Sequence, residues 1–527
     1  MVCIFLLIGT IPNIINSFEG DILNAKDANR TNYKLSVSSS TGNDGIPICS
    51  ANGYQSSSQI INDGIGGYII AWQDERNDDS DIYCQRVNSE GRINWSANEI
   101  PICAISEEQS HPKIVSDGAG GAIVAWLDNR SSNGLDIYTQ RINPSGAIQW
   151  QENGILISNM TINQWRYDII SDGNGGAIVV WEASMPGYNI DIYGQRITSD
   201  GHLNWSTDGV PICNHEQIQL YFQLASDDLG GAIIVWEDRR FSGDGVYAQR
   251  VNLTGHALWS PNGTAICSLM DEDGEKPHII NDGSGMGSVM VSWSDRRNGD
   301  NVDSFAQKLN SSGHWQWIPE GVPICVVPYN WITESPLVGD GCGGAIIVWP
   351  DRRNQEDQHD IYAQRIDTDG TINWTENGVP ICTALGVQSG IALASDGSRG
   401  AIITWVDDRP DVEMDIYAQK INFTGHAKWV PNGTSICSAY DWQYSPQLVC
   451  DGNGGAVISW TDSRNYGNNL NDIYAQRINS EGYPQWSESF GSPGFFGLDL
   501  GSIALITVIA VLSVSVLLVR RRYLKKQ

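Results

Sequence analysis

A tryptophan that recurs at nearly constant spacing limits what this chain can fold into more than any other feature of its sequence. Successive copies lie 54 to 57 residues apart, at Trp72, Trp126, Trp181, Trp236, Trp293, Trp349, Trp405 and Trp460. A second tryptophan recurs with the same period, at Trp95, Trp150, Trp205, Trp259, Trp317, Trp374, Trp429 and Trp486. Self-similarity at a fixed period indicates repeated units that bury their apolar faces against one another. We therefore expect eight copies of one unit over residues 45–486.

Each unit divides into four short apolar segments separated by turns. In the second copy these segments are PKIVS, AIVAW, DIYTQRI and GILIS, and the turns include DGAGG and NPSG. The residues of DIYTQRI alternate in the manner of a half-buried strand. Four strands per unit, with no helical period before residue 500, predict an all-β, eight-bladed β-propeller. A β-solenoid is the alternative, although its coils are usually shorter.

The motif GIPIC at residues 45–49 indicates how the ring closes. Similar motifs end seven of the units, but the last unit has none after Trp486, and this copy stands ahead of the first unit. If the motif forms the outermost strand of each blade, residues 46–49 complete the last blade. Such closure removes exposed sheet edges. The sequence thus predicts a ring closed by its N-terminal strand.

The repeat resembles the WD40-like repeat of TolB-type propellers. In that family a strand ends in a Pro…Asp-Gly turn, an apolar strand follows, and the next strand begins Asp-Ile-Tyr. Pro112, Asp117-Gly118 and Asp136-Ile137-Tyr138 match this order. The repeat is more similar still to the Trp-rich DGxGGAIVAW-type repeats of bacterial and archaeal surface proteins. The resemblance covers residues 45–486 and implies a fold, but propellers host many unrelated activities.

Residues that occur in nearly every copy are interpreted as structural. The motif WxDxR occurs in seven copies, and only the third, WEASM at 181–185, lacks it. We expect its Asp–Arg pair to connect neighbouring strands or blades, because a catalytic carboxylate is needed once or twice rather than seven times. DGxGG is interpreted as a tight turn, with a calcium loop as the weaker alternative.

Seven of the eight GxxIC positions carry cysteine, and Ser158 occupies the eighth. Equivalent atoms in a ring of eight lie about 0.77 radii apart, whereas a disulfide needs Cα atoms within about 7 Å. Outer strands lie too far from the axis for this, so we expect unpaired thiols that fill space between blades. No CxxC or HxxxH spacing occurs, and we predict no metal site.

The two ends of the chain predict a membrane anchor. Residues 501–519 carry no charge and as a helix span roughly 28 Å, about one hydrocarbon core. Five basic residues follow, which places residues 520–527 in the cytoplasm and the propeller outside. Residues 1–17 are interpreted as a signal peptide, with an N-terminal tail as the alternative. Residues 18–44 form a polar segment and 487–500 a tether.

The net charge is −29, which excludes nucleic acid as a partner because such binding relies on basic residues. An outside location agrees with many Asn-x-Ser/Thr sequons, of which three occupy one repeat position, at Asn94, Asn204 and Asn373. These three are the predicted glycosylation sites.

Two loops of each unit vary between copies: the loop after WxDxR and the segment after GxPIC. In a four-stranded meander alternate connections share a face, so both variable loops lie on one face, here named the variable-loop face. DGxGG and NxxG then share the constant-loop face. Function tends to reside on variable loops held by a rigid scaffold. The aromatic residues expected to bind a ligand there are Trp165, Tyr167, Tyr188, Tyr221, Tyr329, Trp331, Trp442 and Tyr444.

Three functions remain open at this point. The first is a membrane-anchored module that binds a glycan or protein at the cell surface. The second is a structural component of the cell envelope. The third is a propeller enzyme acting on carbohydrate, which needs paired carboxylates without repeat equivalents. Candidates for such carboxylates are Asp271, Glu272, Asp273, Glu275 and Glu334, but no motif marks any of them as catalytic.

Overall fold

The computed structural model describes residues 44–77, 79–95, 99–131, 134–187, 189–240, 244–267, 274–299, 301–328, 330–354, 358–409, 413–465 and 471–487. These residues form eight antiparallel sheets of four strands each. They contain no helix, and therefore none long and apolar enough to cross a membrane. The expected signal peptide, tether, transmembrane helix and basic tail lie outside the described residues, apart from Ser487 at the start of the tether.

The blades are numbered in chain order, and the strands of each run from the inner to the outer edge. Blade 1 contains β2 (Gln55–Asn62), β3 (Gly67–Asn77), β4 (Asp79–Asn88) and β5 (Ile100–Cys103), and blade 2 contains β6 (Gln109–Ser116), β7 (Ala122–Asp128), β8 (Asp136–Ile142) and β9 (Ile155–Leu156). Blade 3 contains β10 (Gln164–Ser171), β11 (Ala177–Met185), β12 (Asn189–Ile197) and β13 (Val210–Cys213), and blade 4 contains β14 (Gln219–Ser226), β15 (Ala232–Asp238), β16 (Gly245–Val251) and β17 (Thr264–Ala265).

The second half of the chain repeats this order. Blade 5 contains β18 (Gly274–Asn281), β19 (Val289–Asp295), β20 (Asp303–Leu309) and β21 (Val322–Cys325), and blade 6 contains β22 (Leu337–Gly339), β23 (Ala345–Asp351), β24 (Asp360–Ile366) and β25 (Val379–Cys382). Blade 7 contains β26 (Val387–Ser395), β27 (Ala401–Asp408), β28 (Asp415–Ile421) and β29 (Thr434–Cys437), and blade 8 contains β30 (Gln443–Cys450), β31 (Ala456–Asp462), β32 (Asp472–Ile478) and β1 (Ile46–Cys49).

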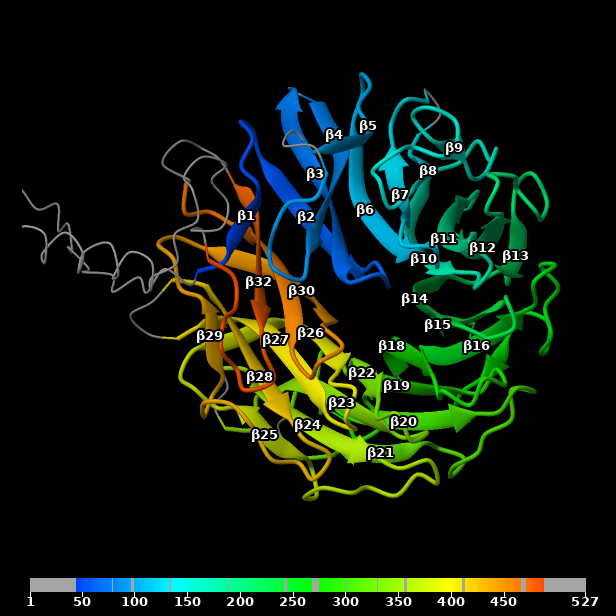
Figure 1. Ribbon diagram of the computed structural model, residues 1–527. Helices are drawn as coiled ribbons and strands as arrows, with labels where there is room; N and C mark the ends of the chain where they lie inside the picture. Colours follow the sequence, from blue (N-terminus) through cyan, green and yellow to red (C-terminus); the bar gives the residue numbers. More distant parts are fainter. Residues whose placement is uncertain are drawn as a thin grey trace, which may run out of the picture. The chain divides into compact units, whose positions relative to one another are not determined.

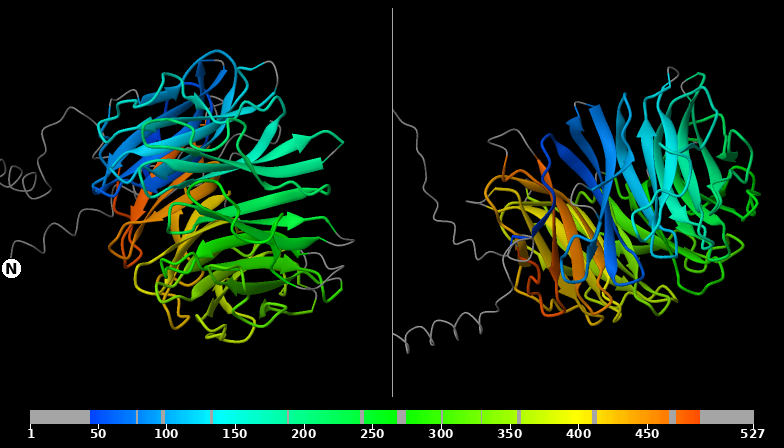
Figure 2. Two further views of the ribbon diagram at one scale, coloured as in Figure 1. Left: turned by 90° about the vertical axis from the view of Figure 1, so that its right-hand side faces the viewer. Right: turned by 45° about the horizontal axis from the view of Figure 1, so that its top comes forward.

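The eight sheets stand around a central axis as the blades of a propeller (Figures 1 and 2). Because each sheet has a neighbour on both faces, apolar side chains are buried on both faces of the middle strands. All seven residues of β7 are buried. The half-buried alternation expected for DIYTQRI is wrong for the same reason: Ile137, Thr139 and Gln140 of β8 are all buried.

The predicted ring closure is confirmed. Strand β1 pairs antiparallel with β32, and Ile46 lies opposite Ala475. The GxPIC segments form the outer strand of every blade, as expected. The first glycine of the motif has a structural reason. At Gly378 φ is +88°, and a Cβ atom would lie 2.6 Å from the ring of the buried Trp349.

The second tryptophan of each unit connects neighbouring blades. Trp95 of blade 1 donates its Nε1–H to the carbonyl oxygen of Pro144 in blade 2, at 3.0 Å. Equivalent bonds join all consecutive blades, and the last joins Trp486 of blade 8 to Ser89 of blade 1, at 3.2 Å. The ring is therefore held closed by the same contact that joins its other blades.

Candidate functional site

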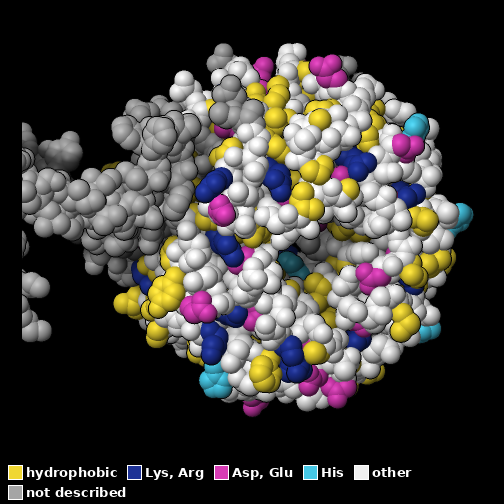
Figure 3. Space-filling view, viewed as in Figure 1, with side chains coloured by type: hydrophobic (Ala, Val, Ile, Leu, Met, Phe, Trp, Pro, Cys, Tyr) yellow, Lys and Arg dark blue, Asp and Glu magenta, His cyan; other side chains and the backbone are white. Residues whose placement is uncertain are grey.

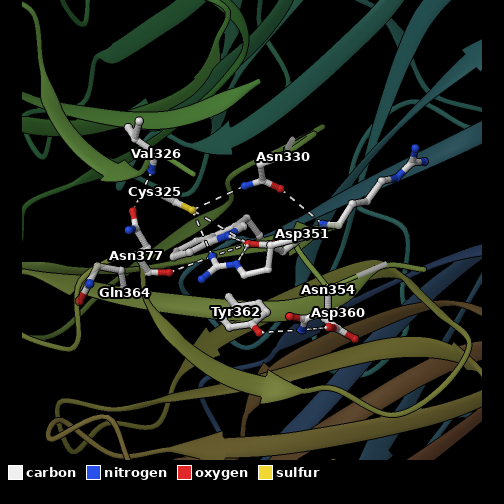
Figure 4. Close-up of polar contacts among 12 residues, drawn as sticks. Cys325, Val326, Asn330, Asp351, Asn354, Asp360, Tyr362, Gln364 and Asn377 are labelled. Atoms are coloured by element: carbon white, nitrogen blue, oxygen red, sulfur yellow. Dashed lines mark hydrogen bonds and ion pairs between the residues drawn. The ribbon is translucent and has the colours of Figure 1, made fainter. Parts of the chain in front are cut away.

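The seven WxDxR motifs form repeated braces between blades. In blade 6 the Asp351 carboxylate accepts hydrogen bonds from Trp349 Nε1 at 3.0 Å and from Arg353 Nε at 2.7 Å (Figure 4). Arg353 also reaches Cys325 Sγ on the outer strand of blade 5, at 3.1 Å. Its guanidinium lies 3.9 Å from the centre of the Tyr362 ring. The structural interpretation of the motif is confirmed, because the Asp–Arg pair connects two blades.

The cysteines are part of these braces. None of the ten cysteines among the described residues forms a disulfide, as predicted. Burial raises the pKa of Cys103, Cys213, Cys325 and Cys382 to about 12, so these thiols stay protonated at neutral pH. They therefore serve as small packing groups beside the arginines rather than as nucleophiles.

Blade 3 is the exception to this pattern. Ala183 and Met185 stand where the other blades carry the aspartate and arginine. Consequently the buried Trp181 Nε1 has no hydrogen-bond partner among the described residues. The preceding blade carries Ser158 at the position where the missing arginine would meet a cysteine. A buried donor without a partner costs about 1–3 kcal/mol, so blade 3 gives up stability that its neighbours keep.

The constant-loop face has paired charges in every blade. In blade 2, Asp117 Oδ1 accepts the backbone N–H groups of Ala119 and Gly121, both at 2.8 Å. The other oxygen accepts Arg141 Nε at 3.0 Å. The same ion pair occurs in all eight blades, with lysine in place of arginine in blades 5 and 7. DGxGG is thus a turn closed by its own aspartate.

Calcium at these turns and glycosylation at Asn94, Asn204 and Asn373 stay predictions. No group of three or more His, Cys, Asp or Glu suited to a metal ion occurs within the described part of the chain. The three asparagines are exposed on the surface. Asn204 Oδ1 accepts a hydrogen bond from Arg196 at 3.0 Å, and Asn373 Oδ1 accepts one from Arg365 at 2.7 Å.

Four of the predicted aromatic residues present their rings to solvent on the variable-loop face. The exposed fractions are 47% for Trp165, 39% for Tyr221, 40% for Trp331 and 56% for Trp442. Trp165 and Tyr221 lie in the inner strands of blades 3 and 4, and Trp331 and Trp442 precede the inner strands of blades 6 and 8 at equivalent repeat positions.

The other four predicted residues do not contribute exposed rings among the described residues. Tyr167 is buried and donates its hydroxyl to the carbonyl oxygen of His111, at 2.6 Å. Tyr444 is partly buried and its hydroxyl lies 2.8 Å from that of Tyr54. Both therefore pack between blades, where their hydroxyls have partners within the ring. Tyr188 and Tyr329 lie outside the described residues.

A β-bulge near the start of the inner strand brings one residue per blade to the mouth of the ring. The pairing register of the first two strands shifts at this point in seven blades. A bulge redirects the side chain that it contains. The residues at this position are Ser57, His111, Arg166, Tyr221, Lys276, Gly390 and Ser445, and Glu334 is the counterpart in blade 6.

Sequence reasoning missed a set of cations at this mouth. Fifteen of the 24 Lys and Arg residues between positions 44 and 487 belong to the repeated braces and turns. Six of the remaining nine lie on blades 2 to 6 at the variable-loop side. We name five of these the basic arc: Arg166, Arg239, Lys276, Arg296 and Arg352. The sequence signal for these residues is that they are lysines or arginines at repeat positions where other copies carry serine or an acid.

The basic arc and the exposed rings lie together. The Arg166 guanidinium stands 4.8 Å from the centre of the Tyr221 ring, and that of Arg296 stands 4.7 Å from the Trp331 ring. Cations at such distances are attracted to the ring face. Arg296 also binds Glu275, with Nε 3.1 Å from the carboxylate. Glu275 was a candidate catalytic carboxylate, and the structure places it in an ion pair.

The acids beneath the basic arc are less exposed than its cations. Glu182 accepts the backbone N–H of Tyr221 at 2.8 Å, and burial raises its pKa. Burial also raises the pKa of Glu237 to about 7, although Arg239 lies 3.1 Å from this carboxylate. The pKa of Glu334 is raised by burial as well. These shifts make the three acids easier to protonate than exposed carboxyl groups.

The positive charges of the basic arc also act on a histidine, His278, on the inner strand of blade 5. The pKa of His278 is lowered to about 4, first by burial and then by the charges of Arg166 and Lys276. Arg166 belongs to blade 3 and Lys276 to blade 5, so the two cations act on one point across blade 4. Figure 3 shows one face of the ring, which is hollowed at its centre.

No protein-family model matches the sequence, and no curated protein is similar to it. Solved structures show similarity of fold. A protein of unknown function from Dyadobacter fermentans has a TM-score of 0.38 at 11% identity, covering 82% of this chain and 96% of that one. A polysaccharide lyase described as an ulvan lyase has a TM-score of 0.44 at 11% identity, covering 84% and 96%. An arabinanase from Penicillium chrysogenum has a TM-score of 0.35 at 11% identity, covering 60% and 94%.

Proposed function

We propose that this chain is an extracellular, membrane-anchored binding module that captures a glycan at the cell surface through its variable-loop face. The anchor is the apolar segment 501–519, with the propeller outside and the C-terminus in the cytoplasm. We also propose that the repeats are of the TolB-type, WD40-like kind and most similar to the Trp-rich DGxGGAIVAW-type repeats of bacterial and archaeal surface proteins.

One observation carries the proposal. Blade 3 lacks the brace that stabilises the other blades, and it is also the blade that presents Trp165 and Arg166 to solvent. Local departures from a stabilising pattern are expected at functional sites. The exposed cluster adjoins the positions where the brace is missing, since Ser184, between Ala183 and Met185, accepts a hydrogen bond from Trp165 Nε1. Stability has thus been exchanged for a particular surface.

Aromatic rings favour a sugar as the ligand. Exposed Trp and Tyr rings offer a flat apolar face with a polar edge, which suits the C–H face of a pyranose ring. Trp165, Tyr221 and Trp331 occur on blades 3 to 6 without equivalents in every blade, as a single site requires. The variable-loop face can therefore discriminate ligands while the repeated scaffold stays constant.

A glycan array probed with the full chain in detergent tests this proposal. The double variant Trp165→Ala, Trp331→Ala is compared with Trp442→Ala, which removes an exposed tryptophan at the repeat position of Trp331, but on blade 8 outside the basic arc. We expect selective glycan binding by the wild type and by Trp442→Ala, and its loss in the double variant. Binding of no glycan by any of the three proteins contradicts the proposal and favours a structural role in the envelope.

A further inference from the structure

We infer that the ligand of the variable-loop face is an anionic polysaccharide, whose carboxylate or sulfate groups are held by the basic arc. This inference rests on the proposed function and adds the chemical class of the glycan. It starts from the distribution of cations in a chain whose net charge is −29.

Most basic residues of the propeller are already committed to acids of the scaffold. Each brace arginine contacts its aspartate, and each turn has its own ion pair. Of the nine cations that remain, Arg92, Arg399 and Lys428 lie on the constant-loop side and are spread over blades 1 and 7. The other six lie on consecutive blades at the opposite side. Their grouping has no structural explanation in the repeat.

The repeat itself shows that these positions do not need a cation. The bulge position that carries Arg166 and Lys276 is occupied by Ser57 in blade 1 and Ser445 in blade 8. The position of Arg239, Arg296 and Arg352 within WxDxR is occupied by Glu75, Asp408 and Ser463 in blades 1, 7 and 8. Blades with serine or an acid at these positions fold in the same way. The cations are therefore dispensable for the fold and available for a ligand.

Two of the cations are exposed and form no salt bridge among the described residues. Arg166 nevertheless acts to lower the pKa of Glu182 against the effect of burial, and Lys276 does the same for Glu334. Arg166 lies over the Tyr221 ring, and Lys276 extends from the bulge of blade 5, where its φ is 47°. Both act on His278, so their charges converge on one point at the mouth. Arg239 and Arg296 are held by Glu237 and Glu275, which orients them as part of the same surface.

A sugar acid fits this surface better than an acidic peptide does. Each arginine that stacks on an exposed ring presents an apolar face and a positive charge side by side, as Arg166 does on Tyr221 and Arg296 on Trp331. A uronate or sulfated sugar offers the complement, because one residue carries both a C–H face and an anion. A carboxylate on a flexible side chain offers only the anion.

Another part of the variable-loop face, away from the inner strands, contrasts with the basic arc. In blade 1 a pocket of about 230 Å³ is lined by Asn77, Asp79, Asp81 and the segment 104–106. Blade 7 adds the exposed acid Asp408. A polyanion approaching this face is repelled there and attracted to blades 3 to 6, which gives it one orientation.

The test compares two triple variants that lower the net charge equally. The arc variant is Arg166→Ser, Arg239→Ser, Lys276→Ser, which uses the residue that the repeat has at these positions. The control is Arg92→Ser, Arg399→Ser, Lys428→Ser, on the constant-loop side. The full chain in detergent is titrated with alginate, dextran sulfate, neutral dextran and polyglutamate.

We expect alginate or dextran sulfate to bind the wild type and the control, and the arc variant to bind about tenfold more weakly, since it lacks three exposed cations that would pair with the anionic groups. Added salt should weaken the binding. Equal affinity of the arc variant and the control overturns the inference, as does binding of neutral dextran alone.

The remaining outcomes separate this inference from the proposed function. Polyglutamate binding as tight as that of the acidic polysaccharides overturns the inference in favour of an acidic protein partner. If a neutral glycan binds and is lost only in the Trp165→Ala, Trp331→Ala variant, the proposed function stands and the anionic ligand is wrong. If the wild type binds no polysaccharide, both are contradicted.

Discussion

The two faces of this propeller are built from the same eight repeats and differ in what they do with charge. On the constant-loop face the aspartate of every DGxGG turn forms an ion pair with a lysine or arginine. The second tryptophan of each unit donates a hydrogen bond to the next blade. On the variable-loop face blades 3 to 6 expose cations, while blades 7, 8 and 1 carry serine, glycine or acids at the same positions; exposed rings also occur on blade 8, at Trp442. Residues repeated around the ring hold it together, and residues that break the repeat are free for a ligand.

Removal of one brace should have the largest effect on stability. In Asp351→Ala the buried Trp349 Nε1 and the Arg353 guanidinium lose their common acceptor. Loss of one partner from a buried pair typically costs about 3–5 kcal/mol. Urea unfolding of the full chain should show this loss. The control is Asp408→Ala in blade 7, which replaces the exposed residue next to the brace aspartate Asp407 and should leave the midpoint unchanged. Equal midpoints for both variants contradict the structural interpretation of the brace.

The glycine of GxPIC gives the next largest effect. Gly378→Ala combines a positive φ with a contact to Trp349 and should destabilise the protein by about 2–4 kcal/mol. Gly397 is the matched control, because its φ of +70° is also positive but a Cβ atom there meets nothing within 4 Å. Gly397→Ala should cost only about 1–2 kcal/mol, the backbone part of the penalty. Thermal unfolding of the two variants separates strain from steric overlap.

How far the sequence predicts this molecule follows from which residues repeat. The period of Trp72 to Trp460 and the displaced GIPIC motif were sufficient for the blade number and the closure, since both depend on a pattern repeated eight times. The exposure of Trp165 was also foreseen. Tyr167, two residues later, was expected on the surface but is buried between blades 2 and 3. A β-bulge lies between Gln164 and Tyr167 and turns the two side chains in different directions. No particular residue type marks such a bulge, so the sequence alone did not predict it.

The basic arc was missed for a different reason. Arg239, Arg296 and Arg352 each stand beside a brace arginine, so in the sequence the pairs RR at 239–240, 296–297 and 352–353 look alike. Only the structure shows that the second arginine of each pair enters the brace while the first remains at the mouth. Which of the two neighbouring arginines pairs with the brace aspartate depends on the side of the strand from which its side chain extends and on its burial.

Stability should rise as the pH falls from neutrality toward 4. Burial raises the pKa of Asp415 to about 7, with further increases from Asp407, Asp44 and Glu413, and that of Asp191 to about 6. The folded state therefore binds protons that the unfolded chain releases near pH 4. This contribution is present below the unfolded pKa and is lost as the pH rises through 6 to 7, on the order of 2 kcal/mol in total.

Urea midpoints at several pH values check this sign. Asp415→Asn keeps the shape of the side chain but cannot titrate, so its stability should change less between pH 5 and 8 than that of the wild type. A wild-type midpoint that instead increases over this range contradicts the assignment of raised pKa values to these acids.

Substitutions in the basic arc should have the smallest effect on stability and the largest effect on ligand binding. Arg166→Ser and Lys276→Ser introduce the residue found at the same bulge in blades 1 and 8, so the free energy of unfolding should change by less than about 0.5 kcal/mol. Differential scanning calorimetry of the two single variants measures this. A loss of several degrees in either Tm means that these cations belong to the scaffold, and the contrast between the two faces no longer holds.

Hydrogen exchange of the full chain, with and without a bound glycan, tests the central claim most directly because it locates the ligand without any substitution. We predict slower exchange at the starts of the inner strands of blades 3 to 5, at residues 164–168, 219–223 and 274–278, with no change in the NxxG turns of any blade. Protection confined to those turns, or spread evenly over all eight blades, contradicts the claim that the ligand binds where the repeat is broken.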